Sequence, residues 1–144
     1  MKHDFELGIR DVEAVIHWIR REAGVAKVGL EGFCMGGKVA YMAAARTDVD
    51  ASVGYYGVGI DQMLNESHAI ANPLMLHVPT ADGFVNAEAQ AAMHAGLDGN
   101  QHVTIHDYVG LDHGFADTFG ARRNAEGAKL AEKRTAEFFA AHVG

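Results

Sequence analysis

Four short apolar runs alternate with longer stretches in which apolar residues recur every three or four positions. The runs have the length of strands and predict them at residues 26–30, 51–56, 73–78 and 102–108. The longer stretches predict helices at residues 4–22, 38–46, 86–96 and 124–143, with one short helix at 60–67. In the first helix Asp4 is the expected N-cap, and the expected inner positions are Ile9, Val12, Ile16 and Ile19. In the last helix the expected inner positions are Leu130, Phe138 and Phe139.

This order of elements predicts the fold class and the place where chemistry is expected. Strand and helix alternate four times, which indicates an α/β fold with a parallel sheet flanked by helices. The 144 residues fit one domain, 1–144, with a single core. Ligands of such sheets bind just beyond the carboxyl ends of the strands, so functional residues are expected in the loops that follow them.

The loop after the first predicted strand carries the most specific motif, Gly32-Phe33-Cys34-Met35-Gly36-Gly37. A nucleophile flanked by small residues between strand and helix resembles the nucleophile elbow of the α/β-hydrolases, with cysteine in place of serine. Such a turn is sharp and strained, so we expect Gly32 and Gly36 to leave room for it and Gly37 to let the helix pack on the sheet. The positive end of the helix is expected to favour the Cys34 thiolate.

Three other interpretations of this motif remain open. Cys34 can be a buried apolar residue, as many lone cysteines are. Gly32 and Gly37-Lys38 match most of a phosphate-binding loop, but Val39 stands at the Ser/Thr position and lacks the hydroxyl that binds Mg²⁺. A low-pKa thiol at the start of a helix can also be a redox sensor.

Two later strand-end loops supply the partners that a nucleophilic cysteine needs. The loop after the third predicted strand contains Asp82, and the loop after the fourth contains His113. His113 is predicted to take the proton of Cys34 and return it to the leaving group, and Asp82 to orient the imidazole. The order nucleophile, acid, histidine is that of the α/β-hydrolases, and the Met35 N–H is the predicted oxyanion donor. Asp112 is an alternative to Asp82, and each residue taken singly can be an ordinary loop residue.

Composition narrows the range of partners. The net charge is -7 and no basic run is present, which argues against a nucleic-acid surface. No apolar stretch has the length of a membrane span or the pattern of a signal peptide, and the single cysteine suits a reducing cytoplasm. The nine histidines are scattered and form no metal-binding motif, so neither a metal nor a cofactor is expected.

Taken together, the motifs resemble the dienelactone hydrolase family, also called carboxymethylenebutenolidases. The resemblance rests on the cysteine elbow, Tyr55-Tyr56-Gly57, residues 73–77 leading to Asp82, Asp112-His113-Gly114-Phe115-Ala116, and the last helix. It implies hydrolysis of a small-molecule ester or lactone through an acyl-thioester on Cys34, without metal or organic cofactor. A thioesterase that uses the same three residues is the nearest enzymatic alternative. The predicted apolar lining of the substrate pocket is Phe33, Tyr56, Phe84 and Phe115.

The resemblance also implies parts that residues 1–144 do not supply. Family members carry further strands before the elbow strand, which provide a second oxyanion donor, an arginine for a substrate carboxylate and a glutamate that activates the cysteine. Another family arginine, four residues after the histidine, is replaced here by Asp117, which we expect to repel an anionic lactone.

Without the additional strands the elbow strand has an uncovered edge, which water-soluble proteins avoid. We therefore expect the domain to be partial, with the edge from Lys27 to Phe33 covered by a missing N-terminal segment or by a second copy in a homo-oligomer. The alternative to an active enzyme is a catalytically incomplete half-domain that acts as an interaction partner or needs its N-terminal half.

Overall fold

The computed structural model describes residues 4–144, and its centre is a four-stranded sheet. The strands run parallel in the order β1-β2-β3-β4. They are β1 (Gly29–Phe33), β2 (Ala51–Tyr55), β3 (Leu74–Pro79) and β4 (Val103–Tyr108). Because the strands are parallel, all four carboxyl ends lie at one edge of the sheet. The predicted α/β class is confirmed.

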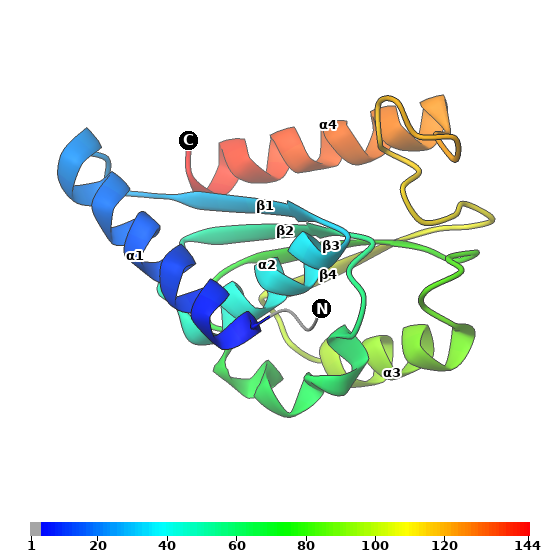
Figure 1. Ribbon diagram of the computed structural model, residues 1–144, viewed down its shortest axis with the longest axis horizontal. Helices are drawn as coiled ribbons and strands as arrows, with labels where there is room; N and C mark the ends of the chain where they lie inside the picture. The colour runs from blue at the N-terminus through cyan, green and yellow to red at the C-terminus, as the bar shows by residue number, and fades with distance from the viewer. Residues whose placement is uncertain (1–3) are drawn as a thin grey trace.

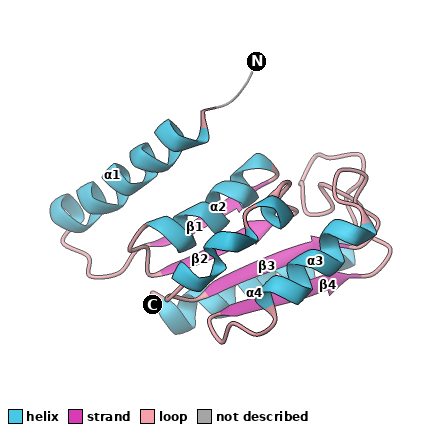
Figure 2. Cartoon of the chain, turned by 90° about the horizontal axis from the view of Figure 1, so that it is seen from below, coloured by secondary structure: helices cyan, strands magenta, loops and turns pink. Residues whose placement is uncertain are grey.

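Helices cover both faces of the sheet (Figure 1). One face carries α4 (Ala125–His142), and the other carries α2 (Met35–Arg46) and α3 (Ala87–Leu97), with α1 (Phe5–Ala23) packed beside α2 (Figure 2). Two 3-10 segments, η1 (Ile60–Gln62) and η2 (Leu64–Ala69), replace the single short helix predicted at residues 60–67. Asp4 caps α1 as predicted, since its Oδ1 accepts hydrogen bonds from the N–H groups of Glu6 and Leu7.

Alternation along the strands divides the core into two main layers. The layer beneath α4 includes Val53, Tyr55, Met75, Ala131 and Phe138. The layer beneath α2 and α3 includes Tyr41, Leu74, Leu76, Val78, Met93 and Leu97. Both faces of β2 and β3 are buried, as expected for strands covered by helices on either side.

The boundaries predicted for the first strand and for the helix after it are wrong. The strand begins and ends three residues later than predicted, and α2 begins at Met35, three residues earlier. Pairing decides the first boundary, because Gly29 is the first residue opposite β2. The N–H of Val28 is instead bound by Asp50 Oδ2 at 2.8 Å, while Val28 O accepts the backbone N–H of Asp50 at 3.1 Å, so a side chain replaces one of the backbone hydrogen bonds there.

The inner face of α4 also differs from the prediction. Leu130, which we expected to face inward, is 42% exposed. Phe138 is buried as predicted, and Phe139 is half-buried against the same cluster. The buried positions of the helix are Gly127, Ala128, Ala131, Thr135 and Phe138. Most of these side chains are small, so the helix backbone lies close to the sheet and the apolar stripe is rotated away from Leu130.

A chain of buried hydrogen bonds ties α4 to the sheet. Thr135 Oγ1 lies 2.7 Å from Tyr55 Oη and 2.9 Å from His77 Nε2, and His77 Nδ1 lies 2.7 Å from Tyr108 Oη. His77 is fully buried, and burial, with the nearby charges of His106 and Arg134, lowers its pKa to about 3. His77 is therefore neutral at physiological pH, and its structural role was not evident from the sequence.

β1 forms one edge of the sheet, and among the described residues it pairs only with β2. The N–H of Cys34, just after the strand, donates to Tyr55 O at 3.0 Å. Since backbone groups alternate in direction along a strand, those of Gly29, Glu31 and Phe33 point away from β2. The edge therefore offers unused hydrogen-bonding groups.

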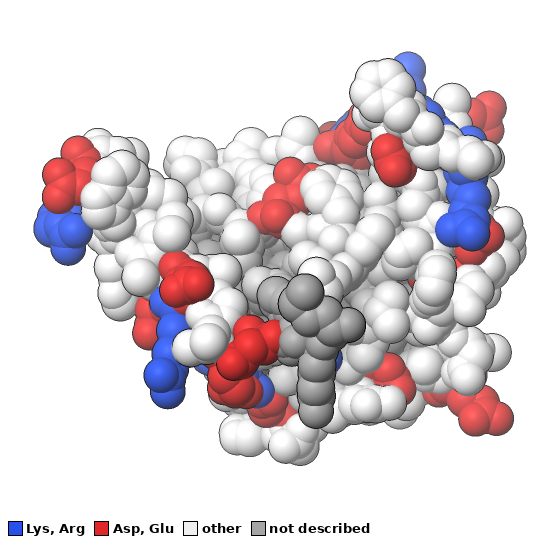
Figure 3. Space-filling model, viewed as in Figure 1, with Lys and Arg blue, Asp and Glu red and all other residues white. Residues whose placement is uncertain are grey.

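The side chains along this edge are only partly exposed. Val28 is buried and Leu30 is half-buried, both in the cluster beneath α1. Phe33 and Met35 are 45% and 51% exposed. Figure 3 shows that few charged side chains occupy the middle of the face on which β1 and α1 lie.

Candidate active site

Cys34 is the single residue between β1 and α2. Its backbone has φ 58° and ψ -118°, and a positive φ is uncommon for a residue that carries a side chain. Such a conformation costs on the order of 1–3 kcal/mol and is found mainly where the surroundings impose it for function. The elbow therefore holds the thiol at the carboxyl edge of the sheet.

At two of the three elbow glycines, neighbouring backbone lies too close for a side chain. A Cβ on Gly32 would overlap the backbone of Gly36, and a Cβ on Gly37 would lie 2.8 Å from Tyr55 O. Gly36 differs from our expectation, because a Cβ there would meet nothing within 4 Å. Its backbone, and not its missing side chain, makes the close contact.

The His113 ring connects Cys34 to Asp82. His113 Nε2 lies 3.2 Å from Cys34 Sγ, and His113 Nδ1 lies 3.1 Å from Asp82 Oδ2. The side chains of His113 and Asp82 are 11% and 1% exposed, so little water competes for these contacts. Asp82 Oδ1 also accepts the N–H of Phe84 at 2.8 Å, which fixes the carboxylate. The structure thus brings together the three residues that the sequence places in separate loops.

Asp112 does not take the place of Asp82. Its Oδ1 accepts the N–H groups of Gly83 at 3.1 Å and His113 at 2.6 Å, and its Oδ2 lies 3.4 Å from Arg122 Nε. These two backbone hydrogen bonds, and then the Arg122 charge, lower the pKa of the Asp112 carboxyl. Asp112 therefore links the loop of Asp82 to the loop of His113 and supports the ring indirectly.

The surroundings of Cys34 disfavour a free thiolate. Burial raises the pKa of the Cys34 thiol, and the negative charges of Asp117 and Asp82 raise it further. This direction is the opposite of what the helix N-terminus led us to expect for the pKa of Cys34. Loss of the Cys34 proton is therefore disfavoured unless a neighbouring group accepts it, and the imidazole of His113 lies in hydrogen-bond contact with Sγ.

Two cavities open beside Cys34. The first, of about 280 Å³, is lined by Phe33, Cys34, Tyr56, Gly114, Ala116, Asp117 and Thr118. The second, of about 320 Å³, is lined by Cys34, His113, Gly114, Asp117, Gly120, Ala121 and Arg122. Most of the lining comes from the loop that follows His113, which the sequence analysis undervalued. The available signal was its position directly beyond the last strand.

The four aromatic residues predicted to line the pocket occupy different places. Phe33 and Tyr56 line the first cavity, and their ring centroids are 6.2 Å apart. Phe84 lies against the His113 ring, at 4.7 Å between centroids. The prediction for Phe115 is wrong: this side chain is fully buried behind Tyr56 and Tyr108 and packs the core.

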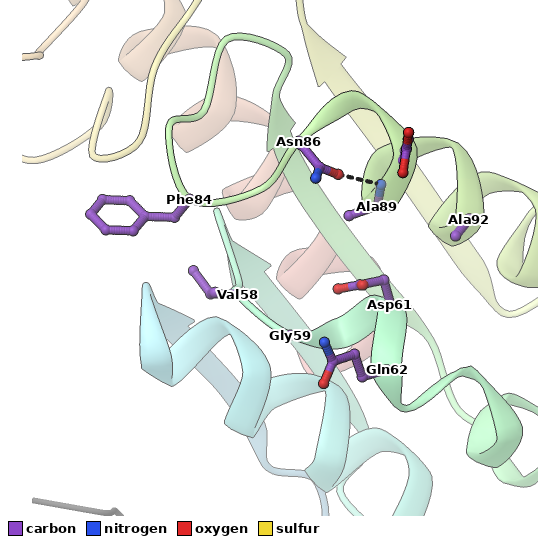
Figure 4. Close-up of a pocket in the computed structure, with 9 residues that line it drawn as sticks. Val58, Gly59, Asp61, Gln62, Phe84, Asn86, Ala89 and Ala92 are labelled. Atoms are coloured by element: carbon purple, nitrogen blue, oxygen red, sulfur yellow. Dashed lines mark hydrogen bonds between the residues drawn. The ribbon is translucent and has the colours of Figure 1, made fainter.

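A third cavity, of about 390 Å³, lies beside Phe84. Figure 4 shows Asp61 and Gln62 of η1 on one side and Asn86, Ala89 and Ala92 on the other, with Phe84 and Val58 at one end. Glu88 provides a second carboxylate. Cys34 and His113 do not line this cavity, which is therefore a neighbour of the site.

The Met35 amide is available as a hydrogen-bond donor. Met35 is the first residue of α2, where N–H groups have no partner within their own helix. No described residue outside α2 accepts a hydrogen bond from this N–H. Its use as the oxyanion donor stays a prediction.

The phosphate-loop interpretation finds no support in the position of Lys38. Its Nζ lies 4.1 Å from the centre of the Phe5 ring, which belongs to α1. Val39 packs in the cluster between α1 and α2. Cys34 is only partly buried and lines two cavities, so it is not a plain core residue either.

Within residues 4–144, no group of three or more His, Cys, Asp or Glu side chains is arranged to hold a metal ion. No helix of this part of the chain is both long and apolar enough to cross a membrane.

This chain matches only part of the length of its relatives of known sequence. The model of the Dienelactone hydrolase family matches residues 1–143. A putative carboxymethylenebutenolidase of Azospirillum brasilense is 47% identical over 110 residues, 76% of this chain and 48% of that protein. The carboxymethylenebutenolidase of Pseudomonas putida is 36% identical over 138 residues, 95% of this chain and 58% of that protein. The chain thus spans about half the length of these curated relatives.

Solved structures show the same fold. A putative dienelactone hydrolase from Klebsiella pneumoniae matches with a TM-score of 0.82 at 24% identity, over 92% of this chain and 60% of that one. An esterase of Pyrococcus furiosus matches with a TM-score of 0.76 at 20% identity, over 100% of this chain and 64% of that one. The parallel sheet and its elbow define an α/β-hydrolase fold. Within that class, the chain belongs to the dienelactone hydrolase family.

Proposed function

We propose that this chain hydrolyses a small ester or lactone by nucleophilic catalysis at Cys34. The observation that carries the proposal is the His113 ring between Cys34 Sγ and Asp82 Oδ2, at 3.2 and 3.1 Å. Membership of the dienelactone hydrolase family supports an ester or lactone as the substrate class.

In the first half of the reaction, neutral His113 accepts the Cys34 proton at Nε2 while the sulfur attacks the carbonyl carbon. Asp82 faces Nδ1 and stabilises the imidazolium that results. The Met35 N–H donates to the carbonyl oxygen as it becomes negative. The bond to the leaving oxygen then breaks, that oxygen takes the proton from His113, and an acyl-thioester remains on Cys34.

In the second half, water attacks the thioester carbonyl while His113 accepts a water proton. The C–S bond breaks as the tetrahedral intermediate collapses, and Cys34 recovers the proton from His113. An ester gives a separate acid and alcohol, whereas a lactone gives one hydroxy acid.

Hydrolysis of p-nitrophenyl acetate tests this proposal. Cys34→Ala and His113→Ala are each expected to lower kcat/KM by about a thousandfold or more, because each removes a group that acts on the reacting atoms. His17→Ala is the matched control, since His17 is an exposed histidine on α1 that lies beside Asp48. Full activity of Cys34→Ala would contradict the proposal.

The intermediate offers a second test. The chain has one cysteine, so an acyl-thioester adds the mass of one acyl group at Cys34 after rapid acid quenching. Peptide mapping locates the adduct, which is expected to be absent from Cys34→Ala. A redox-sensing role is less supported, because burial and two carboxylates raise the pKa of the thiol and oxidation follows thiolate character.

A second candidate function is that of a half-domain completed at β1, which we infer from the strand edge. Gly29, Glu31 and Phe33 direct backbone groups outward, and the exposed Phe33 and Met35 flank Cys34. This chain matches only 48% and 58% of the length of these two relatives. The occupant inferred is therefore the remaining α/β segment of a protein of this family, which places a strand along β1.

This candidate is tested by adding the separately expressed part of the Azospirillum brasilense relative that this chain does not match. Association measured by light scattering, with a rise in kcat/KM, supports completion. Glu31→Pro removes an outward N–H without touching the β2 pairing, so it is expected to abolish association. A dimer of the chain alone that Glu31→Pro dissociates would instead make a second copy the occupant.

A further inference from the structure

The first cavity beside Cys34 combines aromatic faces with one carboxylate. Phe33 is 45% exposed and supplies the accessible ring, whereas Tyr56 is only 3% exposed and contributes little of its ring to the wall. The other lining residues, Gly114, Ala116 and Thr118, are small and uncharged. Asp117 is the one charged residue of the lining.

The charge of Asp117 has no cationic counterpart. Its Oδ1 accepts the N–H of Phe119 at 3.1 Å, and no described residue forms an ion pair with it. Arg122 of the adjoining cavity is paired with Asp112, and Arg123 Nη1 donates to Ala116 O at 3.1 Å. The negative charge of Asp117 acts on Cys34, since it contributes to the raised pKa of the Cys34 thiol.

The position of His113 assigns the two cavities to the two parts of a substrate. His113 returns its proton to the leaving oxygen in the proposed mechanism, so the leaving group lies on the His113 side. The second cavity is lined by His113, and the first is not. We therefore place the acyl group in the first cavity, against Phe33 and Asp117, although Asp117 lines the second cavity as well.

We propose that the first cavity binds a positively charged ammonium group carried by the acyl part of the substrate. Aromatic faces attract such a group through their quadrupoles, and the Asp117 carboxylate attracts it directly. A carboxylate at the same place would be repelled by Asp117 and gain nothing from the rings. The proposal rests on the proposed hydrolysis at Cys34 and adds the charge of its substrate.

Three p-nitrophenyl esters of matched shape test the proposal. Their acyl groups are 4-(trimethylammonio)butanoyl, the uncharged 5,5-dimethylhexanoyl and the anionic hemiglutaryl. The cationic ester is expected to exceed the uncharged one in kcat/KM by about tenfold, and the anionic ester to fall below it. The preference is expected to weaken as salt is added, because the rim of the cavity is open to solvent.

Variants separate the contribution of the Asp117 carboxylate from that of the Phe33 ring. Asp117→Asn is expected to lower the cation-to-neutral ratio by several fold, and Asp117→Arg to reverse the order of cation and anion. Phe33→Leu keeps the apolar volume but removes the ring, so it is expected to lower the ratio by a smaller factor. Asp61→Asn is the matched control, because it removes the same charge from the neighbouring cavity and is expected to leave the ratio unchanged.

A second readout does not require hydrolysis. The single cysteine is modified by methanethiosulfonates, which form a disulfide with Cys34 and release methanesulfinate. The trimethylammonioethyl reagent is expected to react faster than the sulfonatoethyl reagent, relative to their rates with free cysteine. Asp117→Asn is expected to reduce this difference, and Asp61→Asn to leave it intact.

The two readouts distinguish the proposals from each other. If no ester is hydrolysed while the reagents show the Asp117-dependent preference, the ammonium site stands and hydrolysis at Cys34 fails. If all three esters are hydrolysed with ratios that Asp117→Asn does not change, the ammonium site is overturned and the hydrolase stands.

Discussion

Lowering the pH from 7 to 5 is expected to destabilise the fold through the buried side chain of His77. Its pKa is about 3 in the folded chain, against 6.5 for an ordinary histidine. The unfolded state therefore binds the proton first as the pH falls. The contribution of neutral His77 is complete above about pH 6.5 and is lost progressively towards pH 3.

The magnitude follows from linkage. Below the pKa that His77 has in the unfolded chain, each decrease of one pH unit lowers the free energy of unfolding by about 1.4 kcal/mol. Between pH 7 and pH 5 the free energy of unfolding therefore falls by about 2 kcal/mol. His94 acts in the opposite direction, because hydrogen bonds to Asp107 and Asp98 raise its pKa and its contribution grows as the pH falls. A variant that differs only at His77 separates the two effects.

The assay is urea unfolding of the wild-type chain and of His77→Gln at pH 7 and pH 5. Glutamine keeps a neutral polar side chain but does not titrate. The wild-type chain is expected to lose about 2 kcal/mol more than the variant over this interval. Absolute stability is not the test, since the substitution also disturbs the hydrogen bonds to Thr135 and Tyr108.

Equal pH dependence in the two chains would refute the argument that burial keeps His77 neutral. NMR provides the same test without a variant, because the His77 ring resonances are expected not to titrate between pH 8 and pH 5. A midpoint near 6.5 for that ring would contradict the buried assignment.

Other predictions concern the elbow and the core. Gly32→Ala is expected to abolish ester hydrolysis and lower Tm, because the new methyl group overlaps the Gly36 backbone; a normal melting curve with full activity would contradict this. Phe115→Ala is expected to cost about 3–5 kcal/mol in urea unfolding, and Leu130→Ala less than about 1 kcal/mol, because only Phe115 is fully buried. Alkylation of Cys34 by iodoacetamide is expected to keep accelerating above pH 8, because burial raises the pKa of the thiol; a rate that levels off below pH 7 would show the reverse.

Much of the candidate site could be predicted because each of its three groups lies in the loop that follows a strand. Parallel strands bring their carboxyl ends to one edge, so Cys34, Asp82 and His113 meet whatever the details of packing. The choice between Asp82 and Asp112 could not be made in this way. Both belong to loops that touch, and only the coordinates show which carboxylate reaches the Nδ1 of His113.

By itself, the amino-acid order determined the alternation of strand and helix, the elbow and the family, because periodicity and turn chemistry are local properties. Tertiary structure alone decided the burial of Phe115, the exposure of Leu130 and the pKa directions of Cys34 and His77. Burial and desolvation sum over neighbours that are distant in the chain, as the hydrogen bond between Tyr55 and Thr135, 80 residues apart, illustrates. No local pattern encodes such a sum.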